Sequence, residues 1–155
     1  MPDEPIRFHS FIFGLKADSR EQVLQSIAWR IGRDTNADMT WIADQLLQSE
    51  QREASGIGGG VAIPHLKSTP LTIPHLVLAK LATPLDFGAL DGEPVDLVCA
   101  VLSPQMDGVL HLRRLSRVTR LFRESFVLEK LRNAQSEAEM AELFNFTTRQ
   151  QVMAA

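Results

Sequence analysis

The segment Val95-Asp96-Leu97-Val98-Cys99-Ala100-Val101-Leu102 is an almost uninterrupted apolar run. A short run of this kind, bounded by turn signals, predicts a strand that is buried on both faces of a sheet. Residues 76–82 form a second run of the same kind, and Asp91-Gly92 between the two runs predicts a turn. We therefore expect the centre of the fold to be a sheet whose two faces are both covered.

Helical patterns precede these strands in the sequence. Ser19-Arg20-Glu21-Gln22 is a capping box, and apolar residues then recur at helical spacing as far as Gly32, near which we expect the helix to end. A second helix is expected over about residues 39–49, with Asp38 as its N-terminal cap. Before both helices, residues 11–15 are expected to form a first strand.

Helical patterns also follow the strands. An amphipathic helix is expected to begin near His111 and to run to about Phe122, and a shorter helix follows Ser125. Residues 136–139 are another capping box, which opens a helix that reaches about Phe144. Because helices lie before and after a central group of strands, the sequence predicts an α/β sandwich.

The length of 155 residues fits one domain, with a core over about residues 10–144. We expect residues 1–9 to be a loose arm and the tail after Thr147 to be frayed. A net charge of −3 does not suit wholesale nucleic-acid binding, and the sequence has no apolar stretch long enough to enter a membrane. The single cysteine, Cys99, excludes an internal disulfide, and with the other features it favours a cytoplasmic protein.

A glycine-rich run, Gly56-Ile57-Gly58-Gly59-Gly60-Val61-Ala62-Ile63-Pro64-His65, holds the most informative side chain, the imidazole of His65. Glycines allow the backbone to come close to another surface, and bare N–H groups favour an anion such as phosphate. Two nucleotide-binding motifs do not fit this run. Leu66 stands where the phosphate-binding loop needs its second glycine, and Val61 stands where the dinucleotide motif needs its third.

Covalent phosphate chemistry fits the run better, because a neutral imidazole nitrogen can attack a phosphoryl donor and hold the group. His65 is therefore the candidate nucleophile. His111 is a candidate second donor to the phosphoryl oxygens, since it lies at the expected start of a helix. His9 and His75 have no such context and are expected to be structural. A metal site built on two histidines lacks an evident third ligand, so we expect no metal and no organic cofactor.

Three ordered stretches carry a family resemblance. The run that ends at His65, the segment Asp86-Phe87-Gly88-Ala89-Leu90-Asp91-Gly92-Glu93-Pro94-Val95-Asp96-Leu97-Val98, and His111-Leu112-Arg113-Arg114-Leu115 resemble the fructose/mannitol-type enzyme IIA domain of the bacterial phosphoenolpyruvate phosphotransferase system. The nitrogen-regulatory branch is the most similar. The resemblance covers about residues 10–144 and implies a mixed β-sheet flanked by helices on both faces.

The resemblance also implies a function. His65 would accept a phosphoryl group from an HPr-like phosphocarrier protein, and His111 would stabilise that group together with backbone N–H groups of Gly58, Gly59 and Gly60. The chain would then be a phosphotransferase component that signals by binding regulatory target proteins. The alternative is a regulatory binding protein of the same fold that has lost phosphotransfer.

One departure from the family pattern motivates this alternative. The family commonly has an arginine in a Leu-Leu-x-Arg-Glu pattern before the glycines, and here Leu46-Leu47-Gln48-Ser49-Glu50 places Ser49 at that position. Serine cannot replace the charge and the paired donors of a guanidinium. Arg52 follows three residues later. It either reaches the phosphate from a loop or is simply solvated.

The helix expected after His111 is rich in arginine. Arg113, Arg117 and Arg120 share one of its faces. This face is either a solvated surface or a docking surface for an acidic partner, whose approach the positive charges would steer. A nucleic-acid contact fits less well, because the stripe is short and no aromatic side chains accompany it.

Overall fold

The computed structural model describes residues 6–144. Its elements follow the expected order, and helical structure continues over residues 137–144 after the last of them. In chain order they are β1 Ser10–Leu15, α1 Arg20–Thr35, α2 Met39–Arg52, β2 Gly56–Gly58, β3 Val61–Ala62, β4 His65–Thr69, β5 His75–Leu85, β6 Val95–Pro104, the 3-10 turn η1 Gln105–Asp107, α3 Val109–Leu121 and α4 Ser125–Asn133.

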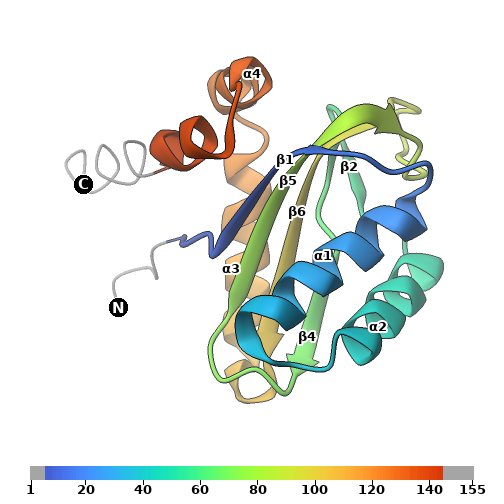
Figure 1. Ribbon diagram of the computed structural model, residues 1–155, viewed down its shortest axis with the longest axis vertical. Coiled ribbons are helices and arrows are strands. Elements are labelled where there is room, and N and C mark those ends of the chain that lie inside the picture. Colours follow the sequence, from blue (N-terminus) through green and yellow to red (C-terminus); the bar gives the residue numbers. More distant parts are fainter. Residues whose placement is uncertain (1–5, 145–155) are drawn as a thin grey trace.

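The strands form one mixed sheet in the order β1-β5-β6-β3-β2, with β4 pairing β6 beyond the end of β3. The pairs β1–β5, β3–β6 and β4–β6 are parallel, whereas β5–β6 and β2–β3 are antiparallel. Helices α1 and α2 cover one face of the sheet and α3 covers the other (Figure 1). The expectation of a mixed sheet with helices on both faces is confirmed.

Strand β6 shows why its sequence is almost wholly apolar. Val98, Ala100 and Leu102 point into the core beneath α1 and α2, and all three are fully buried. Leu97, Cys99 and Val101 point into the second core, beneath α3 and α4, and are equally buried. Side chains alternate between the two faces of a strand, so a strand covered on both faces needs apolar residues at every position.

Helix α1 begins where the capping box predicts, since the Ser19 Oγ accepts a hydrogen bond from the Gln22 N–H at 3.2 Å. The helix continues three residues beyond Gly32 and ends at Asn36, whose φ of 62° turns the chain out of the helix. Gly32 does not end the helix; it allows close packing of α2. A Cβ at Gly32 would lie 2.8 Å from the Cβ of Met39.

The described part of the N-terminal arm is packed, which corrects the expectation that all of residues 1–9 are loose. The ring of Phe8 lies 4.4 Å from that of Phe144 and 6.2 Å from that of Phe122. The His9 N–H donates to the Leu76 carbonyl at 2.8 Å, which extends the pairing of β1 with β5. Residues 1–5 and the tail after Thr147 lie outside the described residues.

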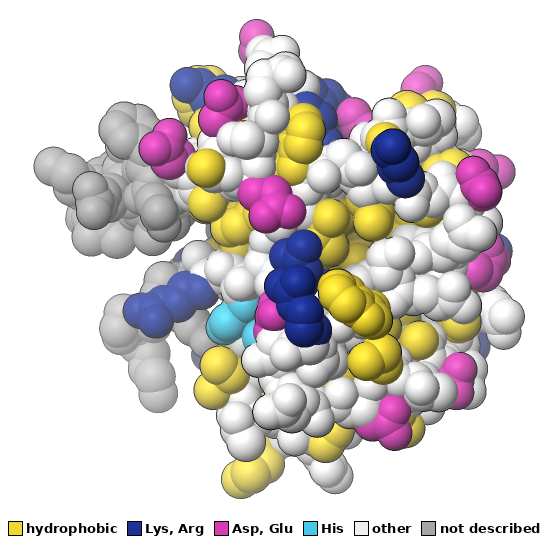
Figure 2. Space-filling view, in the orientation of Figure 1, with side chains coloured by type: hydrophobic (Ala, Val, Ile, Leu, Met, Phe, Trp, Pro, Cys, Tyr) yellow, Lys and Arg dark blue, Asp and Glu magenta, His cyan; other side chains and the backbone are white. Residues whose placement is uncertain are grey.

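No helix within residues 6–144 is long and apolar enough to cross a membrane. The face that carries α1 and α2 shows basic, acidic and hydrophobic side chains intermixed rather than one continuous apolar belt (Figure 2).

Candidate functional site

His65 lies at the start of β4, where its imidazole is half-buried. The Pro64 carbonyl just before it accepts a hydrogen bond from Val101 N–H at 2.9 Å, which fixes this segment against β6. The imidazole Nδ1 lies 2.9 Å from the Ile63 carbonyl oxygen. A carbonyl can only accept a hydrogen bond, so Nδ1 carries the proton. In the neutral ring the lone pair is then on Nε2, which makes Nε2 the nucleophilic atom.

His111 is the partner that the sequence predicted for His65. The centroids of the two rings lie 5.7 Å apart, with 43° between the ring planes. Helix α3 begins two residues earlier than predicted, so His111 lies in its first turn and not at its first residue. The side chain is buried, its Nδ1 lies 2.7 Å from the Ser103 Oγ, and its Nε2 has no hydrogen-bond partner among residues 6–144.

The electrostatic setting keeps His111 neutral. Burial lowers its pKa to about 4, and the neighbouring His65, Arg114 and Lys67 act in the same direction, partly opposed by Asp107. A neutral imidazole with one unpartnered nitrogen beside a half-buried nucleophile is suited to donate a hydrogen bond to an anion held between the two rings.

The predicted role of the glycines as phosphate ligands stays a prediction, and the turn that they form lies away from His65 along the sheet. Gly58, Gly59 and Gly60 have φ values of 94°, 66° and 80°, and they form the turn of the β2–β3 hairpin. The Gly60 carbonyl accepts from Leu97 N–H, whereas His65 pairs with Val101 further along β6. Four strand residues span roughly 13 Å, so the turn lies far from the imidazole.

The groups of this turn also have other partners. The Gly59 N–H donates to the Asp91 Oδ2 at 2.9 Å, and this bond, with one from Glu93 N–H, lowers the pKa of Asp91. The Gly59 carbonyl accepts from Arg132 Nη2 at 2.6 Å. The glycines are present because three consecutive residues need positive φ, which only glycine adopts readily. This run therefore positions the strand that leads to His65.

Ser49, at the position where the resemblance predicts an arginine, lies beside His65. Its Oγ is 3.4 Å from the backbone oxygen of His65. Arg52 is the last residue of α2, one turn further along, and its side chain is exposed. The helix thus extends past the predicted end at Ser49, and Arg52 belongs to it and not to a loop.

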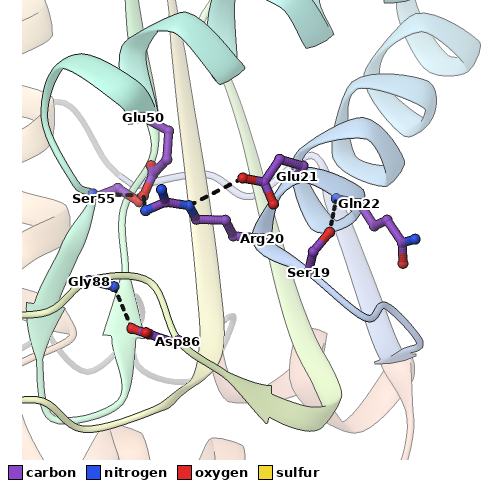
Figure 3. A network of polar contacts seen from close by, with 8 residues as sticks. All are labelled: Ser19, Arg20, Glu21, Gln22, Glu50, Ser55, Asp86 and Gly88. Carbon is purple, nitrogen blue, oxygen red and sulfur yellow. Dashed lines mark hydrogen bonds and ion pairs between the residues drawn. The ribbon is translucent and has the colours of Figure 1, made fainter.

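A buried carboxylate fixes the end of α2 (Figure 3). The Glu50 Oε1 accepts a hydrogen bond from Ser55 N–H at 3.1 Å and lies 3.8 Å from the Nη1 of Arg20. Figure 3 shows Arg20 reaching from α1 toward this carboxylate, between the end of α2 and the Asp86–Gly88 loop. The arrangement links α1, α2 and the start of β2, and so holds Ser49 against His65.

Lys67 is a further candidate site residue that the sequence analysis did not name. It lies two residues after His65 in β4, is exposed, and is close enough to lower the pKa of His111. Residues two apart on a strand share a face, so this spacing was the signal that could have identified it. Among residues 6–144 no three His, Cys, Asp or Glu side chains are arranged to hold a metal ion.

Known proteins match most of this chain. A family model described as "Phosphoenolpyruvate-dependent sugar phosphotransferase system, EIIA 2" matches residues 6–146. A nitrogen regulatory protein of Bradyrhizobium diazoefficiens is 39% identical over 118 residues, which are 76% of this chain and 77% of that protein. The nitrogen regulatory protein of Escherichia coli is 32% identical over 130 residues, which are 83% of this chain and 80% of that protein.

Solved structures share the fold. The nitrogen regulatory protein IIA-Ntr from Neisseria meningitidis superposes with a TM-score of 0.79 at 24% identity, over 88% of this chain and 92% of that one. The mannitol IIA of Escherichia coli superposes with a TM-score of 0.73 at 18% identity, over 86% of this chain and 94% of that one. With the family model matched over nearly the whole chain, the protein belongs to the EIIA 2 family of the phosphoenolpyruvate-dependent sugar phosphotransferase system.

Proposed function

We propose that this chain, acting as a single EIIA domain, is a nitrogen-type regulatory phosphocarrier that accepts a phosphoryl group on His65 from an HPr-like protein. The observation that carries the proposal is the state of the His65 ring. Its Nδ1–H is held by the Ile63 carbonyl, and its Nε2 is left free in a half-buried position beside His111.

The chemistry is an exchange of one N–P bond for another. The Nε2 lone pair of His65 attacks the phosphorus of the donor's phosphohistidine, and the donor's N–P bond breaks with its electron pair returning to the donor imidazole. The buried His111 donates a hydrogen bond to a phosphoryl oxygen. Lys67 adds a positive charge at the solvent side, where the family arginine is missing.

The surface around the site suits a protein partner. Met106, Val109 and Leu112 are large apolar side chains exposed at or just before the start of α3, with exposed fractions of 96%, 66% and 67%. Arg113 and Arg120 continue the same exposed surface along the helix. Apolar residues beside arginines are typical of a docking surface. This is where the donor, and in turn a regulatory target, would bind in the cytoplasm.

The test is to incubate the protein with phosphoenolpyruvate, enzyme I and its cognate HPr-like carrier, and to weigh the intact chain. We expect an acid-labile mass gain of one phosphoryl group that is absent in His65→Ala. His9→Ala, which removes an exposed imidazole away from the site, is the matched control and should gain the same mass as the wild type.

A second candidate is a regulatory binding protein that no longer carries phosphate. Ser49 favours it, because the hydroxyl that replaces the family arginine donates to the backbone oxygen of His65 and supplies no charge. If a donor proven active on another EIIA protein leaves this chain unmodified, the regulatory binding protein replaces the phosphocarrier as the assigned function.

A further inference from the structure

A buried polar cluster surrounds the Nδ1 atom of His111. Ser103, at the end of β6, is fully buried, and Arg114, one turn along α3 from His111, is 7% exposed. The Ser103 Oγ lies 2.7 Å from the His111 Nδ1 and 2.6 Å from the Arg114 Nη1. The Arg114 Nη1 also lies 3.0 Å from a carboxylate oxygen of Asp107.

The protons in this cluster can be counted. A guanidinium can only donate, so Arg114 occupies one lone pair of the Ser103 oxygen. The hydroxyl has a single proton to donate, and His111 Nδ1 is the one acceptor within hydrogen-bond distance of it among residues 6–144. If Nδ1 carried a proton instead, it would have to use the second lone pair of Ser103, and the buried hydroxyl proton would have no acceptor.

We propose that Ser103, with one lone pair held by Arg114, fixes His111 as the tautomer that is protonated on Nε2 and unprotonated on Nδ1. Ser103 and Arg114 are then positioning residues, since they act through His111 and do not touch the phosphoryl group. This inference rests on the proposed function, because the tautomer matters only if His111 binds a phosphoryl group. In that role the Nε2–H donates a hydrogen bond to a phosphoryl oxygen, whereas the opposite tautomer would present a lone pair to the anion.

Asp107 completes the arrangement. Its carboxylate holds Arg114 at the base of α3, so the guanidinium faces Ser103. In this proposal Arg114 acts through His111 and not as a direct phosphate ligand. Arg114 contributes to the site in two ways. It favours the tautomer of His111 that has its proton on Nε2, and its positive charge helps to keep His111 neutral.

The tautomer is measured directly by long-range ¹H–¹⁵N correlation spectra of the imidazole rings of the unphosphorylated protein at neutral pH. The two nitrogens of a neutral ring differ clearly in ¹⁵N shift according to which one carries the proton. We expect His111 Nε2 to be of the protonated type, and Nδ1 to be of the unprotonated type with the shift of a hydrogen-bond acceptor. A protonated Nδ1 in the wild type overturns the proposal without any variant.

Variants test which residues fix the tautomer of His111. In Ser103→Ala the Nδ1 nitrogen loses its donor, so its ¹⁵N shift moves to that of a free ring nitrogen, while Ser103→Thr keeps the hydroxyl and the wild-type shift. Arg114→Met frees the lone pair of Ser103, and a population with a protonated Nδ1 appears. Ser116→Ala, the same change at an exposed position of α3, is the matched control. An unchanged Nδ1 shift in folded Ser103→Ala refutes the role of Ser103.

A transfer assay gives the second readout. The initial rate of His65 phosphorylation in Ser103→Ala and Arg114→Met should fall by about two- to tenfold, in proportion to the loss of the competent tautomer. Since the tautomer is read without any donor, a chain that is never phosphorylated contradicts the proposed function alone. A chain that is phosphorylated with a protonated His111 Nδ1 contradicts this inference alone.

Discussion

The chain has four histidines, and they form two ring pairs on opposite faces of one sheet. His65 and His111 lie on the α3 side with centroids 5.7 Å apart, and His9 and His75 lie near the end of α1 with centroids 4.3 Å apart. Histidine side chains reach the surface on the face that Figure 2 shows. Both pairs contain one buried ring and one more accessible ring.

The pairs differ in what holds their nitrogens. In the first pair each Nδ1 has a polar partner, so each ring presents its Nε2 in a fixed direction. In the second pair the rings are stacked at 20°, and neither nitrogen of the buried His75 has a partner among residues 6–144. Burial and proximity are therefore common to both pairs, and the arrangement of hydrogen-bond partners is what makes one of them a candidate site.

The largest effect should come from removing the buried ring of each pair. His111→Ala should slow phosphorylation of His65 by about 10²–10³-fold, the usual loss when one donor to a developing charge is removed. His75→Ala should leave the rate per folded molecule within about twofold, because its nitrogens donate to nothing at the site. The initial rate of phosphorylation with limiting HPr-like donor is measured for both variants. Equal losses of rate would contradict the assignment of the site to the His65–His111 pair alone.

The next effect is a loss of stability in acid, which both buried rings should cause. Burial lowers the pKa of His75 to about 4, with His9 acting in the same direction, and His111 also has a pKa of about 4. An unfolded histidine titrates near 6.5, so between about pH 6.5 and pH 4 the unfolded chain binds protons that the native chain does not. The free energy of unfolding should fall over this window by roughly 2–3 kcal/mol for each ring.

Urea unfolding at pH 7 and at pH 5 measures this loss. His75→Phe keeps an aromatic ring against His9 and removes one titrating group, so it should lose about half of the acid sensitivity. His111 then accounts for the remainder together with His9, whose pKa is also lowered by burial. A midpoint that is the same at both pH values in the wild type contradicts the assignment of the two rings as buried and neutral.

A smaller effect is expected from the charge beside the site. Lys67→Met should slow phosphorylation by about three- to tenfold, which corresponds to about 1 kcal/mol for an exposed charge acting on an anion. The loss should shrink at high salt, since exposed charges are screened. Lys16→Met, an exposed lysine next to α1, is the matched control and should have no effect on the rate.

Much of the fold followed from periodicity and capping alone. The apolar run in β6, the Ser19 and Asp38 caps and the order of elements all appear in the structure, because burial on both faces of a strand and unsatisfied helix ends impose local sequence rules. His65 and His111 were also predicted from sequence context, and the centroids of their rings lie 5.7 Å apart. The distance between the two rings depends on how α3 packs against β4, and no local sequence pattern predicts that packing.

The polar partners could not be predicted for a similar reason. Ser103 and Arg114 read as an ordinary strand residue and one of several helix arginines, and only the packing of α3 against the end of β6 brings them together. The glycine run shows the same limit of sequence reasoning. Glycines are required equally by a phosphate cradle and by a turn with positive φ, and the sequence alone does not separate the two.

Gly59→Ala separates the two, and of all these variants it has the smallest expected effect on the phosphorylation rate. A Cβ at position 59 meets nothing within 4 Å, so its cost is that of holding an alanine at a φ of 66°. We expect a loss of about 1–2 kcal/mol in the free energy of unfolding. Phosphorylation of His65 should proceed at the wild-type rate, because the turn lies far from both rings. If the glycines bound phosphate, a methyl group at position 59 would block the close approach of the anion. A strong loss of the phosphorylation rate in the folded variant would therefore contradict a role in the turn alone. It would mean that backbone N–H groups of the glycines hold the phosphoryl group together with the rings of His65 and His111.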